Sequence, residues 1–299
     1  GTAGVMADRL YGIPALGTMA HSWVQMFPSE YEAFERYTKL YPDNCTLLID
    51  TYSVLKSGIP NAIQVFDNVL KPMGKRPKGV RIDSGDIAYL SKRARKMLDD
   101  AGYPDCGICA SNSLDEYLVR DLILQDAKVD NFGIGENMIT SKSDPVFGGV
   151  YKLAAVKDGN VYTPKIKISE TVEKMTIPHL KNVYRIYDDT TGKAMADYIT
   201  MHDEIVDATN GITLFDPVET WKVRKFTNVH AKKLNIPIYV NGKRVYENPP
   251  LKEIRAFCKA QVETLWDEVT RFENPHRYYV DLSQKLWNER QRLLQEFGR

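Results

Sequence analysis

Polar side chains that could carry out chemistry recur in the first half of the chain, each just after a short apolar run. His21 follows "IPALGTMA", Asp50 follows "TLLI", and Arg81 and Asp83 lie in "VRIDSGD". A histidine can act as a nucleophile or a proton carrier, and an arginine can hold a carboxylate or phosphate through two parallel hydrogen bonds. The set therefore suits an anionic substrate and a step at an imidazole.

Two later runs add hydroxyl, amide and backbone groups to this set. "ICASN" ends at Ser111 and Asn112, and "FGIG" supplies Gly133 and Gly135. The side chains of Asp83 and Asn112 could hydrogen-bond to sugar hydroxyls. The two glycines would let backbone N–H groups approach a phosphate closely. Together these residues favour a phosphorylated sugar with a second anionic group.

Each of these residues also has a purely structural explanation. The sequence Asp-Ser-Gly-Asp, ending at Asp86, is a good helix N-cap, and Arg81 could simply pair with a neighbouring carboxylate. A lone His21 is more often structural than catalytic, and a short G-x-G lacks the fuller dinucleotide fingerprint. Their joint placement after successive apolar runs is what favours a functional site.

The runs themselves predict strands, and most are followed by a segment with helical periodicity. The apolar stripe from Ile87 to Ala101 and the capping box "SLDE" at Ser113–Glu116 support two of the helices. Strands joined by single helices run parallel, in an open doubly wound sheet or a barrel, and both place active sites at the strand C-termini. The predicted strand and helix pairs are 13–17 with 29–41, 45–51 with 54–70, 79–86 with 87–101 and 106–112 with 114–125, followed by a strand at 130–135.

The second half of the chain has a different pattern. From Gly148 onward, apolar runs are separated by Asp-Gly, Thr-Gly and Asn-Gly turns, which are typical of antiparallel hairpins. Amphipathic helices are predicted over 251–272 and 283–297. We therefore expect two domains: an α/β barrel portion over residues 1–155 that carries the strand-end residues, and an α+β region over residues 156–299.

The composition excludes several classes of protein. The 299 residues include 40 basic and 39 acidic residues without a basic, aromatic-rich stretch, so we expect no nucleic-acid partner. There is no apolar run long enough to cross a bilayer, so we expect no membrane association. Four cysteines do not make a disulfide framework, which favours a cytoplasmic location. We interpret the C-x-x-C at Cys106 and Cys109 as two buried strand cysteines rather than a metal or redox motif.

Five longer motifs resemble the nicotinate phosphoribosyltransferase family. They are, in order, "GTMAHSWVQMF", "LIDTYSVLKSGIPNAI", "GVRIDSGDI", "ASNSLDEY" and "GIGENMITSKSDPVFGGVYKL", and the later "DLSQKLW" is also similar. The resemblance runs from Gly1 to nearly the last residue.

This resemblance implies a type II phosphoribosyltransferase, in which an incomplete parallel α/β barrel is combined with a smaller antiparallel β and helical region. The family forms nicotinate mononucleotide and pyrophosphate from nicotinate and phosphoribosyl pyrophosphate (PRPP), in NAD salvage. Mg²⁺ is held mainly by the PRPP pyrophosphate. The family couples this reaction to ATP hydrolysis through a phosphohistidine, which His21 matches. The resemblance also implies a homodimer.

The resemblance assigns six positions to the substrates: Thr18 and Arg81 to nicotinate, Asp83 and Asn112 to the ribose, and Gly135 and Glu136 to the 5-phosphate. Many relatives have Thr or Gly where Glu136 stands, so only its backbone N–H is expected to contact a phosphate. Related nicotinamide enzymes have an aspartate where Ala3 stands, and Ala3 would not repel a carboxylate. Nicotinate is therefore expected over nicotinamide.

One departure from the family leaves an alternative open. Family members carry a substantial N-terminal portion ahead of the segment that matches Gly1, and only about five strands precede Gly148 where a barrel needs about eight. We expect this missing segment to be supplied elsewhere. The alternative is a non-catalytic or split-subunit fragment that binds a phosphosugar or a partner chain. A quinolinate or nicotinamide phosphoribosyltransferase is a third hypothesis.

Overall fold

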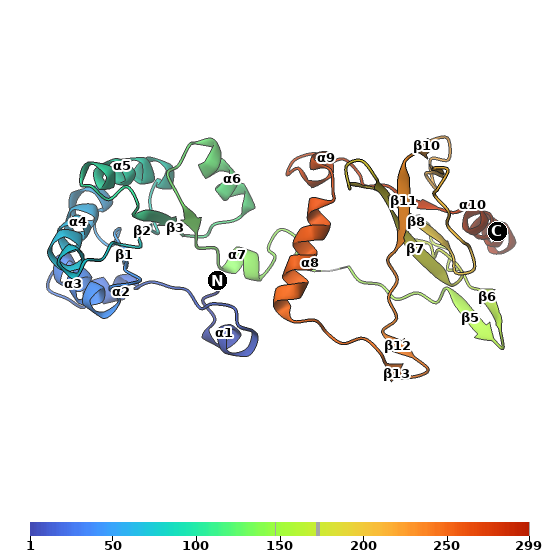
Figure 1. The fold of residues 1–299 in the computed structure, drawn as a ribbon, viewed down its shortest axis with the longest axis horizontal. Helices are drawn as coiled ribbons and strands as arrows, with labels where there is room; N and C mark the ends of the chain where they lie inside the picture. The colour runs from blue at the N-terminus through green and yellow to red at the C-terminus, as the bar shows by residue number, and fades with distance from the viewer. Residues whose placement is uncertain (147, 172–173, 299) are drawn as a thin grey trace. The chain divides into compact units, whose positions relative to one another are not determined.

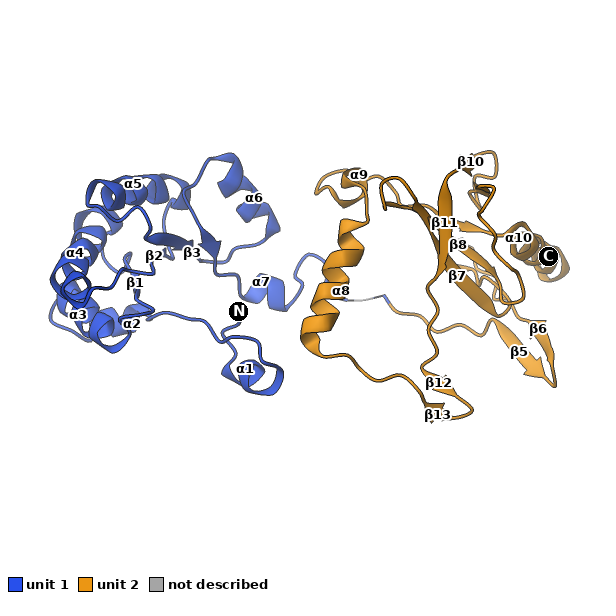
Figure 2. Ribbon diagram, in the orientation of Figure 1, with its two compact units in different colours: residues 1–148 blue, residues 149–299 orange. Residues whose placement is uncertain are grey.

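The strands predicted in the first half of the chain form one parallel sheet. The structure, a computed structural model, describes residues 1–146, 148–171 and 174–298. The chain divides into two compact units, called here unit 1 (Gly1–Gly148) and unit 2 (Gly149–Arg299), which are coloured separately in Figure 2. Each unit is described by itself.

The sheet of unit 1 contains four strands in the order β1-β2-β3-β4, which is also their order along the chain. Every neighbouring pair is parallel, as expected for strands whose connections contain helices. The described part of the chain therefore has the predicted parallel α/β arrangement in this unit. The strands are β1 (Thr46–Leu48), β2 (Gly79–Ile82), β3 (Gly107–Ala110) and β4 (Asn131–Phe132).

Helices cover the outer side of this sheet (Figure 1). One of them begins at a predicted cap, because the Asp86 side chain accepts a hydrogen bond from the Tyr89 amide. Ser29 caps α3 in the same way by accepting from the Glu32 amide. The helical segments are α1 (Val5–Tyr11), α2 (His21–Gln25), α3 (Glu30–Leu40), η1 (Val54–Gly58), α4 (Ile59–Val65), η2 (Phe66–Leu70), η3 (Lys71–Met73), α5 (Ile87–Asp100), α6 (Glu116–Leu124) and α7 (Glu136–Ile139).

The core of unit 1 lies between the sheet and the helical segments other than α1, η3 and α7, which have no buried residues. Phe34, Phe66, Leu98 and Ile108 are fully buried in one apolar cluster. The helical segment after β1 packs so closely that a Cβ atom at Gly58 would lie 1.9 Å from the Ile49 carbonyl oxygen. Only glycine permits this approach, which fixes the helix against the end of β1.

Two local predictions for unit 1 are wrong. The run at 13–17 does not form a strand of the sheet: Ala15 makes an isolated bridge with Thr2, and Leu16 is 60% exposed. An apolar run becomes a strand only where a neighbour pairs with it. The capping box also fails, because Ser113 has a φ of 48° and α6 instead starts after Asp115, whose side chain accepts from the Leu118 amide.

Unit 2 is built mainly from antiparallel strands, as the hairpin signals predict. Its main sheet has the order β11-β7-β8-β14, in which only β14 runs parallel to its neighbour β8. Asn241 and Gly242, at the predicted tight turn, both have positive φ. The strands are β5 (Ala155–Asp158), β6 (Val161–Pro164), β7 (Lys181–Asp188), β8 (Ala194–Met201), β9 (Ile212–Phe215), β10 (Val223–Phe226), β11 (Val229–Lys233), β12 (Tyr239–Val240), β13 (Lys243–Arg244) and β14 (Val280–Leu282).

The helix predicted over 251–272 is divided into α8 (Leu251–Glu263) and α9 (Asp267–Thr270). The Lys193 ammonium donates to the carbonyls of Glu263 and Leu265, which stabilises the end of α8. The final helix, α10 (Gln284–Phe297), starts after Ser283 as predicted, and the Ser283 hydroxyl accepts from the Leu286 amide. Among the described residues, none of the helices has both the length and the apolar character needed to cross a lipid bilayer.

Candidate active site

Polar side chains meet at the carboxyl edge of the sheet in unit 1. Asp50, Asp83 and Ser111 follow β1, β2 and β3 within two residues of the strand ends. Because the three strands are parallel and adjacent, their carboxyl ends lie side by side. The topology thus collects residues that are far apart in the sequence.

The Arg81 guanidinium is held by three neighbours. Its Nε donates to Ser111 Oγ at 2.8 Å, Nη1 to Thr18 Oγ1 at 3.0 Å and Nη2 to Asp83 Oδ1 at 2.9 Å. The Ser111 hydroxyl in turn donates to Asp83 Oδ1. An arginine has five N–H donors, so these bonds leave one on each terminal nitrogen. Arg81 is therefore fixed in orientation and can still bind an anion.

The carboxylates of Asp50 and Asp83 each use one oxygen for the protein and turn the other toward His21. Asp50 Oδ2 accepts from the Asp83 backbone N–H at 2.9 Å and from Ser84 Oγ at 2.6 Å. The remaining oxygens, Asp50 Oδ1 and Asp83 Oδ2, lie 3.9 and 3.6 Å from His21 Nε2. The Asp50 carboxylate is only 2% exposed, so it acts on the imidazole with little screening by water.

The two nitrogens of the His21 ring therefore face different groups. Nε2 faces the two carboxylates, whereas Nδ1 lies 3.1 Å from the hydroxyl oxygen of Thr51. Carboxylates only accept hydrogen bonds, so they favour the proton on Nε2. The lone pair of the neutral ring is then on Nδ1, and the Thr51 hydroxyl donates to it.

The charge state of Asp83 is set by opposing effects. Burial disfavours the charged carboxylate, but hydrogen bonds from Ser111 and Arg81 and the nearby positive charge outweigh burial and lower the pKa of Asp83. Asp83 is therefore ionised at neutral pH and can hold a proton on His21 Nε2.

Four of the residues predicted from the sequence lie in this cluster: Thr18, His21, Arg81 and Asp83. Three others do not join it, since no hydrogen bond or ion pair between described residues links Asn112, Gly135 or Glu136 to these four. Asn112 is exposed with a φ of 95°, and Gly135 and Glu136 are exposed at the start of the four-residue helix α7.

Other members of the cluster were given no role by the sequence. Asp50 and Ser111 were recognisable at their strand ends, but their partners were not. The sequence analysis assigns no role to Thr51 or Ser84. The available signal was their position, because each directly follows an aspartate of the cluster. A hydroxyl residue next to a strand-end aspartate can contact the same partner as the aspartate, as Thr51 and Asp50 both do at His21.

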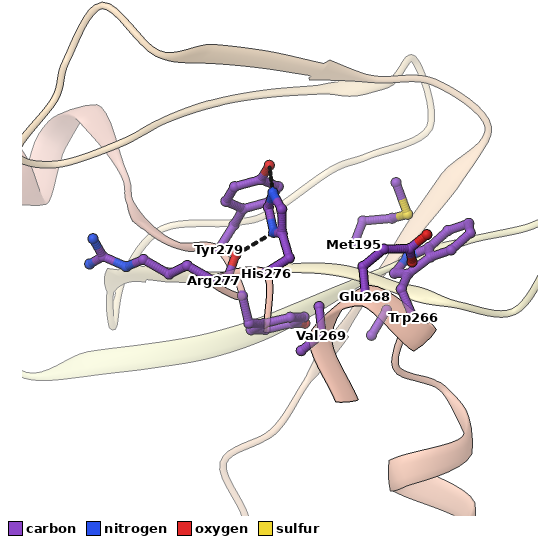
Figure 3. Close-up of a pocket in the computed structure, with 9 residues that line it drawn as sticks. Met195, Trp266, Glu268, Val269, His276, Arg277 and Tyr279 are labelled. Carbon is purple, nitrogen blue, oxygen red and sulfur yellow. Dashed lines mark hydrogen bonds between the residues drawn. The ribbon is translucent and has the colours of Figure 1, made fainter. Parts of the chain in front are cut away.

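Unit 2 contains a cavity of about 210 Å³ lined by Met195, Trp266 and the segment His276–Tyr279 (Figure 3). The Tyr279 hydroxyl lies 3.3 Å from His276 Nε2, and His276 Nδ1 lies 2.9 Å from the Arg277 carbonyl oxygen, as the dashed lines in Figure 3 show. Both ring nitrogens are thus engaged within the protein. The cavity also contains none of the predicted site residues, so unit 1 holds the better candidate site.

The second cysteine of the C-x-x-C motif lies next to the candidate site, because Cys109 of β3 is paired with Arg81 of β2. Cys106 is buried just before β3, Cys109 is half-buried in the strand, and both are free thiols. Burial raises the pKa of Cys106 to about 12, which suppresses the thiolate. Within the described ranges, no three or more His, Cys, Asp or Glu side chains are grouped so that they could hold a metal ion.

Comparisons with known proteins agree along the whole chain. The family model for the nicotinate phosphoribosyltransferase C-terminal domain matches residues 180–290. Nicotinate phosphoribosyltransferase from Bacillus subtilis is 40% identical over 297 residues, which is 99% of this chain and 60% of that protein. The chain is similar to nicotinate phosphoribosyltransferases over nearly its whole length. The relative from Caenorhabditis elegans is 31% identical, over 96% of this chain and 60% of its own length.

A solved structure of the same family supports the fold. Human nicotinic acid phosphoribosyltransferase superposes with a TM-score of 0.75 at 24% identity, over 99% of this chain and 64% of that one. This similarity confirms a mixed α/β structure with parallel and antiparallel sheets. The chain spans about three-fifths of the length of the curated relatives that it matches.

Proposed function

We propose that this chain carries the phosphoribosyl-transfer site of a nicotinate phosphoribosyltransferase, which makes nicotinate mononucleotide and pyrophosphate from nicotinate and PRPP. The observation that supports this most strongly is the oriented His21, with carboxylates at one ring nitrogen and a hydroxyl at the other, beside the fixed Arg81. The resemblance to nicotinate phosphoribosyltransferases indicates the substrates. ATP hydrolysis drives the reaction, which makes the enzyme a ligase.

Arg81 binds the nicotinate carboxylate through its two remaining terminal N–H groups, and Thr18, which already contacts Arg81, lies beside the same ligand. The pyridine nitrogen attacks C1 of the ribose while the bond from C1 to the pyrophosphate oxygen breaks. Positive charge develops on the ribose in this step, and the ionised Asp83 stabilises it. The protein mainly positions the reactants and supplies electrostatic stabilisation.

His21 carries the phosphoryl group that couples ATP to this reaction. The Nδ1 lone pair attacks the γ-phosphorus of ATP, the N–P bond forms, and the bond from that phosphorus to the bridging oxygen breaks as ADP leaves. The proton on Nε2 stays between the ring and the carboxylates of Asp50 and Asp83, which offset the positive charge of the ring. Water later cleaves the N–P bond and releases phosphate.

Mg²⁺ is expected to bring most of its ligands with it. The described residues include no group of three or more acidic, histidine or cysteine side chains suited to a metal ion. By family resemblance, Mg²⁺ would be held mainly by the pyrophosphate of PRPP and by water, as is usual for this ion at phosphate sites. When bound, the ion neutralises charge on the pyrophosphate leaving group.

The remaining contacts are assigned by family resemblance. Asn112 would bind the ribose, and the backbone N–H groups at Gly135 and Glu136 would bind the 5-phosphate, which their exposure permits. The family resemblance also implies a homodimer as the active form. The four free thiols fit a reducing compartment such as the cytoplasm.

Phosphate labelling tests this function. The active assembly is incubated with γ-labelled ATP, and the acid-labile label is mapped to a residue. We expect it on His21 and expect His21→Ala to abolish it, whereas His230→Ala, which changes a histidine of unit 2 paired with Asp189, keeps it. Label on another residue, or label that survives in His21→Ala, would refute the assignment.

Product analysis tests the substrates. The assembly is supplied with PRPP, ATP and one of three bases, namely nicotinate, nicotinamide or quinolinate. We expect pyrophosphate release and mononucleotide formation with nicotinate. The absence of product with all three bases would support a non-catalytic fragment, and a preference for either other base would replace the proposed substrate.

A further inference from the structure

We propose that Thr51 is a positioning residue for His21: its hydroxyl holds the Nδ1 lone pair in the resting enzyme and donates to the phosphoryl group once that group is on Nδ1. This inference rests on the proposed role of His21 as a phosphoryl carrier. It assigns a function to a residue for which neither the sequence nor the family resemblance suggested one.

The first observation is that consecutive residues hold both nitrogens of one ring. Asp50 and Thr51 follow β1 directly, with Asp50 Oδ1 3.9 Å from Nε2 and Thr51 Oγ1 3.1 Å from Nδ1 of His21. The close packing at Gly58 fixes the backbone here, because Gly58 contacts the Ile49 carbonyl. The ring is therefore oriented by a short segment of chain that has little freedom to move.

The second observation is which groups face the two nitrogens of the His21 ring. The charged groups nearest Nε2 are the carboxylates of Asp50 and Asp83, and the positive charge of Arg81 lies behind Asp83. Since Nε2 faces acceptors, it carries the proton, and Nδ1 has only its lone pair to offer to Thr51. The Thr51 hydroxyl must then be the donor in the 3.1 Å contact.

Phosphoryl transfer changes the partner of this hydroxyl. When Nδ1 bonds to phosphorus, its lone pair is used and can no longer accept from Thr51. The new phosphoryl oxygens lie on the same side of the ring, and rotation about the Cβ–Oγ bond redirects the O–H to one of them. Thr51 gives up no proton in this step. A hydrogen bond to a charged acceptor is stronger than one to a neutral ring, so the hydroxyl stabilises the phosphorylated state.

Two substitutions separate the hydroxyl from the shape of the side chain. Thr51→Val keeps the branched shape but removes the donor, whereas Thr51→Ser keeps the donor. A matched control is Thr38→Val, which removes a buried hydroxyl of unit 1 that contacts Cys45 Sγ at 3.3 Å, away from His21. All three variants are compared with the wild-type chain.

The resting contact is tested by nitrogen NMR of the imidazoles, which needs no catalytic activity. We expect His21 to show a protonated Nε2 and a hydrogen-bonded, unprotonated Nδ1. Thr51→Val should shift the Nδ1 signal, and Thr51→Ser and Thr38→Val should leave it near its wild-type position. A wild-type ring protonated on Nδ1, or an Nδ1 signal unchanged in Thr51→Val, would overturn the proposal.

The phosphorylated state is tested by the lifetime of labelled His21 in the active assembly. Loss of one hydrogen bond to a charged group should shorten the lifetime about 10- to 100-fold in Thr51→Val, with Thr51→Ser close to wild type. Equal lifetimes in the wild type and Thr51→Val would overturn the role of Thr51. The absence of label on wild-type His21 is a different outcome, because it refutes the proposed function itself.

Discussion

Each unit contains a partly buried arginine–aspartate pair, and the two pairs differ in what they leave free. In unit 2, Arg185 binds both oxygens of Asp197, at 2.8 and 3.0 Å, and the Tyr278 hydroxyl donates to the same carboxylate at 3.1 Å. In unit 1, Arg81 and Ser111 share one oxygen of Asp83, and the other oxygen faces His21. In the structural pair of unit 2, both carboxylate oxygens are used by groups within the unit. In the pair at the candidate site, one carboxylate oxygen remains available to another group.

Two partly buried aspartates, Asp83 of unit 1 and Asp281 of unit 2, have pKa values shifted in opposite directions. Hydrogen bonds and the charge of Arg81 overcome burial and lower the pKa of Asp83. Burial dominates at Asp281 in unit 2 and raises its pKa to about 6, although Arg224 lies 3.1 Å away. The charged form is thus favoured where a cation must be stabilised and disfavoured inside the packed unit 2.

The largest expected effect is on stability, when the Arg185–Asp197 pair of unit 2 is broken. Arg185→Ala leaves the buried Asp197 charge without its bidentate partner, and we expect the free energy of unfolding to fall by about 3 kcal/mol. Urea unfolding followed by circular dichroism measures this loss. Arg95→Ala serves as a comparison, since Arg95 donates to two backbone carbonyls and its ion-pair partner Asp99 is about half exposed. A loss below about 1 kcal/mol in Arg185→Ala would contradict the comparison.

Disrupting the Arg81–Asp83 pair of unit 1 should weaken the binding of nicotinate. Arg81→Ala removes charge-assisted hydrogen bonds to the nicotinate carboxylate, so we expect about 2 kcal/mol weaker binding, or about 30-fold. Arg81→Lys should not restore binding, because an ammonium lacks the planar fork. The measurement is the affinity of the active assembly for nicotinate and for nicotinamide. Equal losses for the two bases would show that Arg81 does not bind the carboxylate.

A third prediction follows from the opposite pKa shifts of Asp83 and Asp281. Because the folded protein holds a proton on Asp281 up to a pKa of about 6, the stability of unit 2 should fall as pH rises from about 4 to about 6 and then level off. The contribution of Asp83 has the opposite sign: it is complete above the ordinary carboxyl pKa and is lost only as pH falls below it. Asp281→Asn should remove the first dependence, which urea unfolding at about pH 5 and pH 7 would show.

The smallest effect concerns the thiols. Burial raises the pKa of Cys45 to about 11 and that of Cys106 to about 12, whereas Cys258 is exposed on α8. In the folded chain at about pH 8, a thiol reagent should rapidly label Cys258, and Cys258→Ser should remove this fast phase. Urea should expose the remaining thiols. Fast labelling of Cys106 would show that the C-x-x-C motif is accessible.

Elements with strong local signals could be predicted from the sequence. The apolar stripe of α5 and the Ser283 cap of α10 act within one helix, so the sequence determines them almost alone. The run at 13–17 has strand composition, but a strand also needs a partner, and only Ala15 is bridged. A sequence pattern shows whether a segment has the composition of a strand, but it does not show whether a second strand is available to pair with it.

The site could be predicted only in part, for a related reason. Parallel strands bring their carboxyl ends together, so residues such as Asp83 could be nominated from topology alone. The partners of Arg81 could not, because the choice between Ser111 and its neighbour Asn112 depends on which side chain turns toward β2. The structure gives that position to Ser111, and the positive φ of Asn112 takes its side chain elsewhere.

The sheet order β1-β2-β3-β4 has a consequence for synthesis on the ribosome. Each new strand adds to the edge left by the one before it, so unit 1 can grow in the order in which it is translated. The hydrogen-bond partners of Arg81 are complete only after Ser111 has emerged from the ribosome. The first and last of these partners, Thr18 and Ser111, are 93 residues apart in the sequence, the difference between 111 and 18. Loop-closure entropy must be overcome before these contacts form, so we expect the Arg81 side chain to be fixed late in the folding of unit 1.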